Sequence, residues 1–280
     1  MEGQHHIFDR PVYVARTLAA MGSAANLLDR HIASELAERL AVINRSFNTA
    51  ALITSRPDAS REILLEGGKC MKINVFPPNQ EDSLSLPEAG FDAVFSLLDL
   101  HTVNDVPGNL ALAARALRPD GLALFAFFAG DSLRELRACW LEAESEITGG
   151  VSPRVAPMID LRETGGLLQR AGLALPVADM DTVTLRYDNA IALMQELKVL
   201  GFANAMTGRS RRFVSRRLLQ RVAEIYQQRF ADSDGRIRAT VEIAWALAWK
   251  PHPSQQQPLK PGSAKARLAD ALRPPENSSG

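Results

Sequence analysis

The sequence has few cysteines and lacks the marks of several classes of protein. Only two cysteines occur among 280 residues, Cys70 and Cys139. A disulfide framework and a cysteine-based zinc site are therefore excluded, whereas a single disulfide stays open. No run of about 18 apolar residues could span a bilayer, and the first residues lack the apolar stretch of a secretory signal. These absences predict a cytoplasmic protein without a transmembrane segment.

Neither sign of charge is in excess. Basic and acidic residues number 32 each, so the formal net charge is zero, and no global field steers the protein toward nucleic acid or anionic lipid. We therefore expect no nucleic-acid partner. Arginines are still concentrated between Arg209 and Arg221. This stretch is either the solvated face of an amphipathic helix or a docking patch for an acidic partner or phosphate.

Motifs of nucleophilic and nucleotide chemistry are absent. The sequence has no serine–histidine–aspartate or cysteine–histidine arrangement, no P-loop and no dinucleotide fingerprint. His5 and His6 lie together but lack cysteine or acidic partners at ligand spacing, so no metal site is predicted. No catalytic residue can be named from such motifs.

Apolar runs typical of strands alternate with helical patterns along the chain. Strands are predicted at 49–54, 69–76, 91–100, 121–130, 182–187 and 240–250, and helices at 18–43, 60–67, 106–117, 131–147, 160–173, 188–201 and 215–230. A turn is expected at 118–121, and Asp131 or Ser132 is expected to cap the helix after it. This alternation predicts a doubly wound, mostly parallel α/β sheet.

The chain is expected to form one domain over residues 1–250. Within it, residues 45–150 are predicted to be the half that would meet a cofactor, and residues 151–250 the half that would meet a substrate or partner. Residues 251–280 are rich in proline, glutamine, serine and glycine, which predicts a mobile C-terminal tail.

Several phrases of the sequence resemble one family. FDAVFSLLDLHTVNDVPG, followed by LRPDG, is similar to a strand and turn of the BioC-like class I S-adenosylmethionine-dependent methyltransferases. FFAGDSLRELR, GGVSPRVAP, LLQRAGLALPVAD and GSAKARLADAL narrow the resemblance to the branch of the mitochondrial arginine-hydroxylase assembly factor of respiratory complex I, especially its alphaproteobacterial relatives. The resemblance covers almost the whole chain.

The resemblance implies a Rossmann-like sheet of seven strands, with helices on both faces and a helical insert or annex near its C-terminal end. It also implies an S-adenosylmethionine site at the carboxyl ends of the first strands, as is general for open α/β sheets. The residues that it would place there are Thr54, Ser55, Arg56, Asn74, Leu97 and His101.

The cofactor turn itself departs from the family. Where the family reads approximately LDLGCGRG, this chain reads ALITSRPD, so that Thr54, Arg56 and Asp58 replace glycines. Glycine is needed there because the ligand lies against the backbone and because the turn adopts conformations that a Cβ disfavours. Arg56 would place a long side chain in the space of the methionine group, and Pro57 removes a backbone donor.

The stretch that follows the turn is also altered. Between the first strand and FDAV the chain is shorter than the family by about one helix–strand unit. Asn74 stands nearest to the family's acidic ribose ligand, and an amide lacks the charge-assisted strength of a carboxylate. Glu81 and Asp82 in the next loop could compensate. Both changes predict that S-adenosylmethionine binds weakly or not at all.

Three functions stay open. The first is a family member, methyltransferase or arginine hydroxylase, that assembles or modifies a respiratory-chain subunit with a weakened cofactor site. The second is a non-catalytic pseudoenzyme that binds a protein partner, and the third is a BioC-like O-methyltransferase acting on an acyl carrier. Near the predicted site, His101, Asn104 and Asp105 form either a polar rim of the pocket or a helix cap. Asp131 is either a substrate contact or a helix cap.

Overall fold

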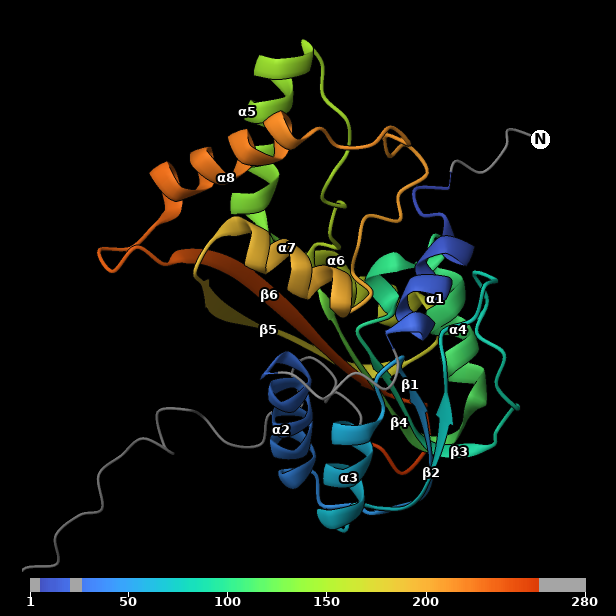
Figure 1. Ribbon diagram of the computed structural model, residues 1–280. Helices are drawn as coiled ribbons and strands as arrows, with labels where there is room; N and C mark the ends of the chain where they lie inside the picture. The colour runs from blue at the N-terminus through green and yellow to red at the C-terminus, as the bar shows by residue number, and fades with distance from the viewer. Residues whose placement is uncertain (1–5, 21–26, 257–280) are drawn as a thin grey trace, which may run out of the picture.

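The computed structural model describes residues 6–20 and 27–256, and its centre is a six-stranded sheet (Figure 1). The strand order is β2-β1-β3-β4-β6-β5. The strands are β1 (Phe47–Ile53), β2 (Cys70–Phe76), β3 (Phe91–Leu97), β4 (Leu117–Phe128), β5 (Ala174–Tyr187) and β6 (Ile237–Trp249). Neighbours from β2 to β4 are parallel, and β6 runs antiparallel to both β4 and β5. The predicted mostly parallel sheet is confirmed.

Helices cover both faces of this sheet and form an annex at one end. The helices are α1 (Arg10–Ala19), α2 (Leu27–Ala41), α3 (Asp58–Glu66), α4 (Val106–Ala116), α5 (Arg134–Thr148), α6 (Leu161–Arg170), α7 (Ala190–Val199) and α8 (Arg216–Phe230), with a 3-10 turn η1 (Leu100–Thr102) after β3. The residues that pack with α2 and α3 belong to one hydrophobic cluster, and those that pack with α4 and α6 belong to another. The doubly wound architecture is thus confirmed.

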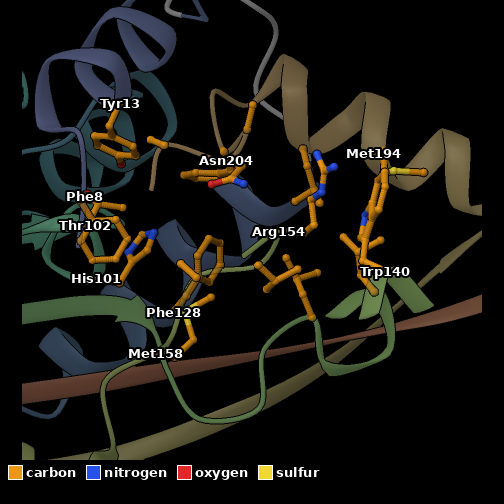
Figure 2. Close-up of a pocket in the computed structure, with 18 residues that line it drawn as sticks. Phe8, Tyr13, His101, Thr102, Phe128, Trp140, Arg154, Met158, Met194 and Asn204 are labelled. Carbon is orange, nitrogen blue, oxygen red and sulfur yellow. The ribbon is translucent and has the colours of Figure 1, made fainter. Parts of the chain in front are cut away.

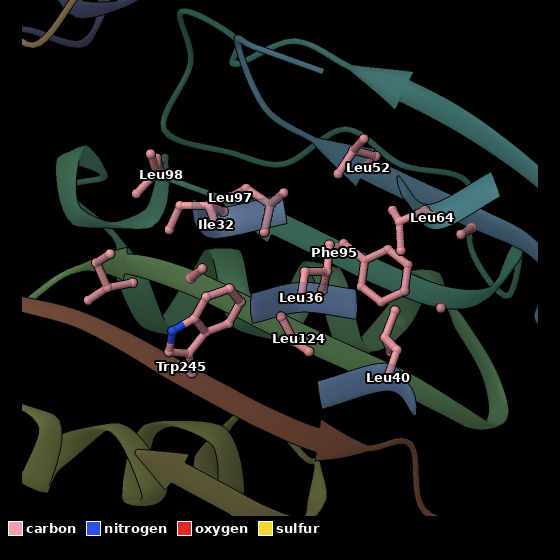
Figure 3. Packing of buried hydrophobic residues seen from close by; sticks show 14 of the residues in the cluster. Ile32, Leu36, Leu40, Leu52, Leu64, Phe95, Leu97, Leu98, Leu124 and Trp245 are labelled. Atoms are coloured by element: carbon pink, nitrogen blue, oxygen red, sulfur yellow. The ribbon is translucent and has the colours of Figure 1, made fainter. Parts of the chain in front are cut away.

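Alternate residues of each strand supply the two clusters, as the two-residue period of a strand requires. On the face of α2, Leu36 and Leu40 pack with Phe95, Leu124 and Trp245 (Figure 3). The residues next to them in β4, such as Phe125, belong to the cluster on the other face. Continuous apolar runs in the sequence therefore mark strands that are buried on both sides.

A helical annex stands at one end of the sheet. Helices α7 and α8 are inserted between β5 and β6, and Figure 1 shows α5 and α8 side by side beyond the sheet. Their buried residues include Leu136, Val222 and Tyr226, which pack with Ile237 at the start of β6. The predicted insert is confirmed. The amphipathic interpretation of the arginine-rich stretch is confirmed from Arg216 onward, whereas Arg209, Arg211 and Arg212 lie in the segment before α8.

Within the described residues the sheet has six strands, one fewer than the seven expected. No helix or strand occurs between the end of β2 at Phe76 and the start of β3 at Phe91, a segment that the structure describes completely. The chain therefore lacks one helix–strand unit of the family's fold, as its shortened spacing predicts. Strand β2 consequently lies at the edge of the sheet.

The predicted helix 18–43 is wrong at its start. Helix α1 ends at Ala19 and α2 begins at Leu27, and residues 21–26 between them lie outside the described part. Helix α1 forms earlier because Asp9 caps it, accepting a hydrogen bond of 3.4 Å from the Val12 N–H. Pro11 in its first turn is compatible with a helix start.

Two local predictions need correction. Residues 118–121 do not separate two elements but form a bulge inside β4, whose pairing jumps from Leu117 to Leu122 around Asp120 at φ 63°. Neither Asp131 nor Ser132 caps α5, which begins after Leu133 without a side-chain cap. The Ser132 hydroxyl instead bonds the carbonyls of Ala129 and Glu242, because β6 passes beside it.

The C-terminal segment is described only in part. Residues 251–256 carry no helix or strand, and residues 257–280 of the predicted tail lie outside the described part. Within the described ranges, none of the helices is both long enough and apolar enough to cross a bilayer.

Candidate functional site

The bend after β1 is built from ordinary backbone conformations. Thr54 and Ser55 are buried there. The Thr54 N–H donates a hydrogen bond of 3.2 Å to the Phe76 carbonyl, and the Thr54 hydroxyl accepts one of 3.2 Å from the Arg56 N–H. No residue from Thr54 to Asp58 has a positive φ. The bend is therefore not a glycine turn with larger side chains added but a different local fold.

Arg56 is held between β1 and the helices before it. Its Nε donates a hydrogen bond of 2.7 Å to the Asp29 carboxylate of α2, and its Nη1 donates one of 3.2 Å to the Ala20 carbonyl. The side chains of Arg56 and Asp29 are both only 8% exposed. A buried ion pair thus closes the position at which the family has a bare glycine.

Two other predicted cofactor residues lie in the sheet itself. Asn74 pairs with Ala51 in the β1–β2 register, two residues before β2 ends. Leu97 is the last residue of β3 and is buried in the cluster under α2. Neither they nor Thr54, Ser55 and Arg56 line the two cavities described next.

A strand-end cavity of about 190 Å³ lies at the carboxyl ends of the first strands. Its lining includes Arg10, Ile53, Phe76, Asp99 and Asn109. The Arg10 guanidinium lies 2.7 Å from one Asp99 oxygen and donates a hydrogen bond of 2.8 Å to the other. Burial raises the pKa of Asp99 above its ordinary value, against the lowering effect of the Arg10 charge. An ion pair again occupies the region where the family holds its cofactor.

A larger pocket of about 220 Å³ lies beside η1 (Figure 2). We call it the aromatic pocket, and its lining includes Phe8, Tyr13, His101, Phe128, Trp140, Phe202, Met158, Met194, Arg154 and Asn204. Figure 2 shows His101, Phe128 and Met158 on one side, with Trp140 and Met194 across from them. These walls come from α1, η1, β4, α5, α7 and two long loops.

His101 is the one predicted cofactor residue that reaches this pocket. Its ring centroid lies 4.8 Å from that of Phe128 and 6.1 Å from that of Phe202. Burial, together with the Arg10 charge, lowers the pKa of His101 to about 3. The imidazole is therefore neutral at physiological pH, and its buried Nδ1 has no hydrogen-bond partner among the described residues.

The neighbours of His101 have structural roles. Asp105 caps α4 by accepting a hydrogen bond of 2.9 Å from the Gly108 N–H, so the capping interpretation is confirmed for this residue. Asn104 instead joins two segments, accepting from the Phe8 N–H at 2.8 Å and donating to Asp82 at 2.6 Å. Asp131 is exposed and does not line the aromatic pocket.

Sequence reasoning missed most of the aromatic pocket. Phe8, Tyr13, Trp140, Arg154 and Phe202 line the pocket but were not among the candidates, because they are far apart in the chain. A signal did exist for one of them, since the phrase GGVSPRVAP, which contributes to the family resemblance, contains Arg154.

One group of metal-ligand side chains lies outside these cavities. Ligand atoms of His31, Glu35 and Asp181 lie within 4.8 Å of one another, and His31 Nε2 has no hydrogen-bond partner in the described part of the chain. However, the Arg39 guanidinium pairs with Glu35 and lies 3.0 Å from Asp181. Because arginine keeps its charge, a cation would have to displace it, and we assign no metal to this group.

Comparisons with known proteins point to one family. A family model described as methyltransferase domain matches residues 22–125. The arginine-hydroxylase NDUFAF5, mitochondrial, of Danio rerio is 31% identical over 267 residues, which are 94% of this chain and 78% of that protein. In further mitochondrial arginine-hydroxylases the matched part spans about half of the relative, from 44% to 56% of its length.

Two methyltransferases are also similar. The malonyl-acyl-carrier-protein O-methyltransferase of Laribacter hongkongensis is 35% identical over 208 residues, which are 73% of this chain and 67% of that protein. The solved structure of Haemonchus contortus phosphoethanolamine N-methyltransferase 2 in complex with S-adenosyl-L-methionine matches 85% of this chain and 57% of that chain, with a TM-score of 0.45 and 11% identity.

Proposed function

The chain belongs to the mitochondrial arginine-hydroxylase family within the class I methyltransferases, and from this membership we propose that it acts on a protein partner. The proposed role is the assembly or modification of a respiratory complex I subunit, with S-adenosylmethionine binding weakened or lost. Within one domain over residues 1–250, we assign residues 45–150 to the former cofactor side and residues 151–250 to the partner side.

The observation that carries this proposal is the ion pair between Arg56 and Asp29. A sulfonium cofactor in this fold lies against a bare turn and the first backbone N–H groups of the next helix. Here Arg56 and Thr54 supply side chains at that turn, and Pro57, the N-cap residue before α3, has no N–H. The ligand would have to displace a buried salt bridge to reach the backbone.

The shortened segment after β2 supports the same proposal. The loop 77–90 replaces one helix–strand unit and leaves a cavity of about 190 Å³ at the strand ends. Pockets for cofactor-sized ligands are typically about 300–1,000 Å³. Phe76, Pro77 and Pro78 line this cavity, so no carboxylate stands at the end of β2 to hold a ribose.

Calorimetric titration tests the cofactor part of the proposal. The full chain is titrated with S-adenosylmethionine and with its demethylated product, with the Laribacter enzyme in the same buffer as the positive control. We expect no binding at micromolar concentrations. A low-micromolar dissociation constant would refute the proposal. The variant Thr54→Gly/Arg56→Gly should bind more tightly than the natural chain if the side chains are the obstacle.

Complementation tests the partner role. The chain, fused to a mitochondrial leader, is expressed in cells that lack the arginine-hydroxylase NDUFAF5, and complex I is followed on native gels. We expect assembly to be restored. Mass spectrometry of the complex I subunits then separates the alternatives: a hydroxylated arginine marks an active enzyme, and its absence marks a non-catalytic assembly factor. Failure to restore complex I would contradict the partner role.

A second candidate function rests on the arginine-rich segment before and within α8. Arg211, Arg212, Arg216 and Arg217 are all exposed, and Phe213 between them is fully exposed. Such a surface complements an acidic acyl carrier protein, which is the substrate carrier in the name of the Laribacter enzyme. Biolayer interferometry against malonyl-acyl carrier protein tests this alternative. Binding that is lost in Arg211→Glu/Arg212→Glu would support it.

A further inference from the structure

The aromatic pocket has the size of one substituted ring. An apolar cavity of about 150 Å³ accommodates benzene, and drug-sized ligands occupy about 300 Å³ or more. The aromatic pocket measures about 220 Å³ and falls between these limits. It therefore suits a single side chain of a partner rather than a cofactor.

The walls of the pocket favour an aromatic occupant. Phe128 and Phe202 meet edge to face with centroids 5.1 Å apart, and His101 lies against both. Aromatic rings prefer such offset and edge contacts to one another. Met158 and Met194 add sulfur atoms to the lining, and thioether sulfur also packs favourably against ring edges.

Only one polar side chain of the lining has no partner among the described residues. The Tyr13 hydroxyl donates to the Leu98 carbonyl at 3.0 Å, and Asn204 donates to the Pro153 carbonyl at 2.8 Å. Thr102 and Arg154 are likewise hydrogen-bonded. His101 is the exception: it is 6% exposed and its buried Nδ1 bonds nothing. Buried polar atoms are rarely left so. Nδ1 has almost no accessible surface, so a ligand hydroxyl in the pocket would meet Nε2, the ring nitrogen that is not fully buried.

The pocket does not suit a cationic side chain. None of the 18 lining residues is aspartate or glutamate. The one lining arginine, Arg154, already donates a hydrogen bond of 2.8 Å to Glu144 and stacks over Trp140 at 4.7 Å. Burial, and to a lesser extent the Arg10 charge, lowers the pKa of His101, and both effects oppose a second positive charge nearby. A guanidinium buried here would lack a counter-charge.

We propose that the aromatic pocket binds a neutral phenol, the side chain of a tyrosine on the protein partner, with its hydroxyl on His101 Nε2. This proposal rests on the proposed function, which supplies the protein partner. A phenol hydroxyl both donates and accepts, so it serves either tautomer of the imidazole. The pocket then recognises a tyrosine beside the point of action and excludes an arginine from the pocket itself.

Ligand-observed NMR with small probes tests the proposal on the full chain. The probes are p-cresol, toluene and n-propylguanidinium, which share a similar reach and differ in ring and charge. We expect p-cresol to bind about 2- to 10-fold more tightly than toluene, as one net hydrogen bond implies, and n-propylguanidinium not to bind. A short peptide with a central tyrosine should compete with p-cresol.

Two histidine variants locate the hydrogen bond. His101→Phe keeps a ring at the site and removes its nitrogen atoms, so the preference for p-cresol over toluene should fall toward 1. His252→Phe is the matched control, since His252 is exposed and does not line the pocket, and it should leave the ratio unchanged. If His101→Phe does not fold, the relative affinities of the natural chain for the three probes still test the proposal.

The proposal is overturned by p-cresol binding no more tightly than toluene, by guanidinium binding as tightly as p-cresol, or by a preference that His101→Phe leaves intact. If p-cresol binds and the tyrosine peptide does not compete with it, the ligand is not a tyrosine of a protein partner. The pocket would then bind a free small-molecule phenol. S-adenosylmethionine added to the same samples keeps the two proposals apart. Its tight binding would refute the lost cofactor site and leave the phenol result standing.

Discussion

Removal of Arg10 should leave the buried Asp99 carboxylate without its cationic partner. Arg10 is 4% exposed and Asp99 is 6% exposed, and the guanidinium contacts both carboxylate oxygens at 2.7 and 2.8 Å. It also donates a hydrogen bond of 2.7 Å to Thr102 and one of 3.2 Å to the Asn79 carbonyl. The variant Arg10→Met keeps most of the side-chain volume and removes all of these contacts.

The expected loss is large. Removing one partner of a buried ion pair destabilises a protein by about 3–5 kcal/mol. At about 2–4 °C per kcal/mol, the melting temperature of Arg10→Met should fall by roughly 6–20 °C. The double variant Arg10→Met/Asp99→Leu removes both charges and should recover most of this loss, since an apolar replacement of the whole pair is often neutral. Arg115→Met, at an exposed ion pair with Glu88, is the matched control and should change little.

The loss should also depend on pH. Burial already raises the pKa of Asp99, and without the Arg10 charge it rises further. A carboxyl group with a raised pKa in the folded state destabilises that state progressively as the pH rises from the ordinary pKa toward the raised one. The part of the Arg10→Met penalty that comes from the Asp99 charge should therefore be greatest at neutral pH and should be lost below the ordinary value of 3.8.

Urea unfolding followed by circular dichroism, repeated at several pH values, measures both effects. A decrease in the free energy of unfolding of less than about 1 kcal/mol at neutral pH would show that the Arg10–Asp99 pair stabilises the protein less than a buried ion pair should. A loss that stays constant on acidification would show that Asp99 is not the group responsible.

Three further predictions concern packing and reactivity. Burial raises the pKa of the Cys70 and Cys139 thiols to about 12, so a thiol reagent at mildly alkaline pH should modify neither in the folded protein and both after unfolding in urea. Leu36→Ala should lower the free energy of unfolding by about 2–5 kcal/mol, because Leu36 is fully buried under the sheet face. Gly201→Ala should destabilise more than Gly235→Ala in the same urea assay: both have φ above 80°, but only at Gly201 would a Cβ lie 2.7 Å from the backbone of α1.

The fold was largely predictable because its signals are local. The runs at 91–97 and 121–128 are apolar except for Asp92 and Ser96, and strands covered on both faces require such runs. Helix α8 shows its buried face in Leu218, Val222 and Ile225 at helical spacing. Patterns of this kind come from which face a residue buries, and neighbouring letters suffice to read them.

Predictions failed where contacts with distant segments of the chain determine the role of a side chain. The cap predicted at Ser132 follows local preference, but its hydroxyl is bonded to Glu242, 110 residues away in the chain. The partnership of Arg10 with Asp99 spans 89 residues. Local sequence holds no record of these contacts, because each side chain alone is compatible with several environments.

Of the candidate site, the sequence predicted mainly which cofactor-binding features are missing. Missing glycines are visible at Thr54 and Arg56, but the carboxylate that holds Arg56 comes from α2 and could not be named in advance. His101 was found from its place after a strand. The rings around it come from distant parts of the chain, and only the folded chain brings Phe128, Trp140 and Phe202 together.

The missing helix–strand unit was removed from the border of the sheet. Among the described strands β2 is bonded to β1 alone, while β1, β3 and β4 each keep two neighbours. Deletion at a border interrupts a single line of backbone pairing, whereas deletion of an inner strand would split the molecule in two. One side of the family's ligand site is formed by this edge of the sheet. A deletion there can therefore remove residues that bind the ligand and leave the hydrophobic core intact. Ligand binding can thus be lost while the stability of the fold is retained.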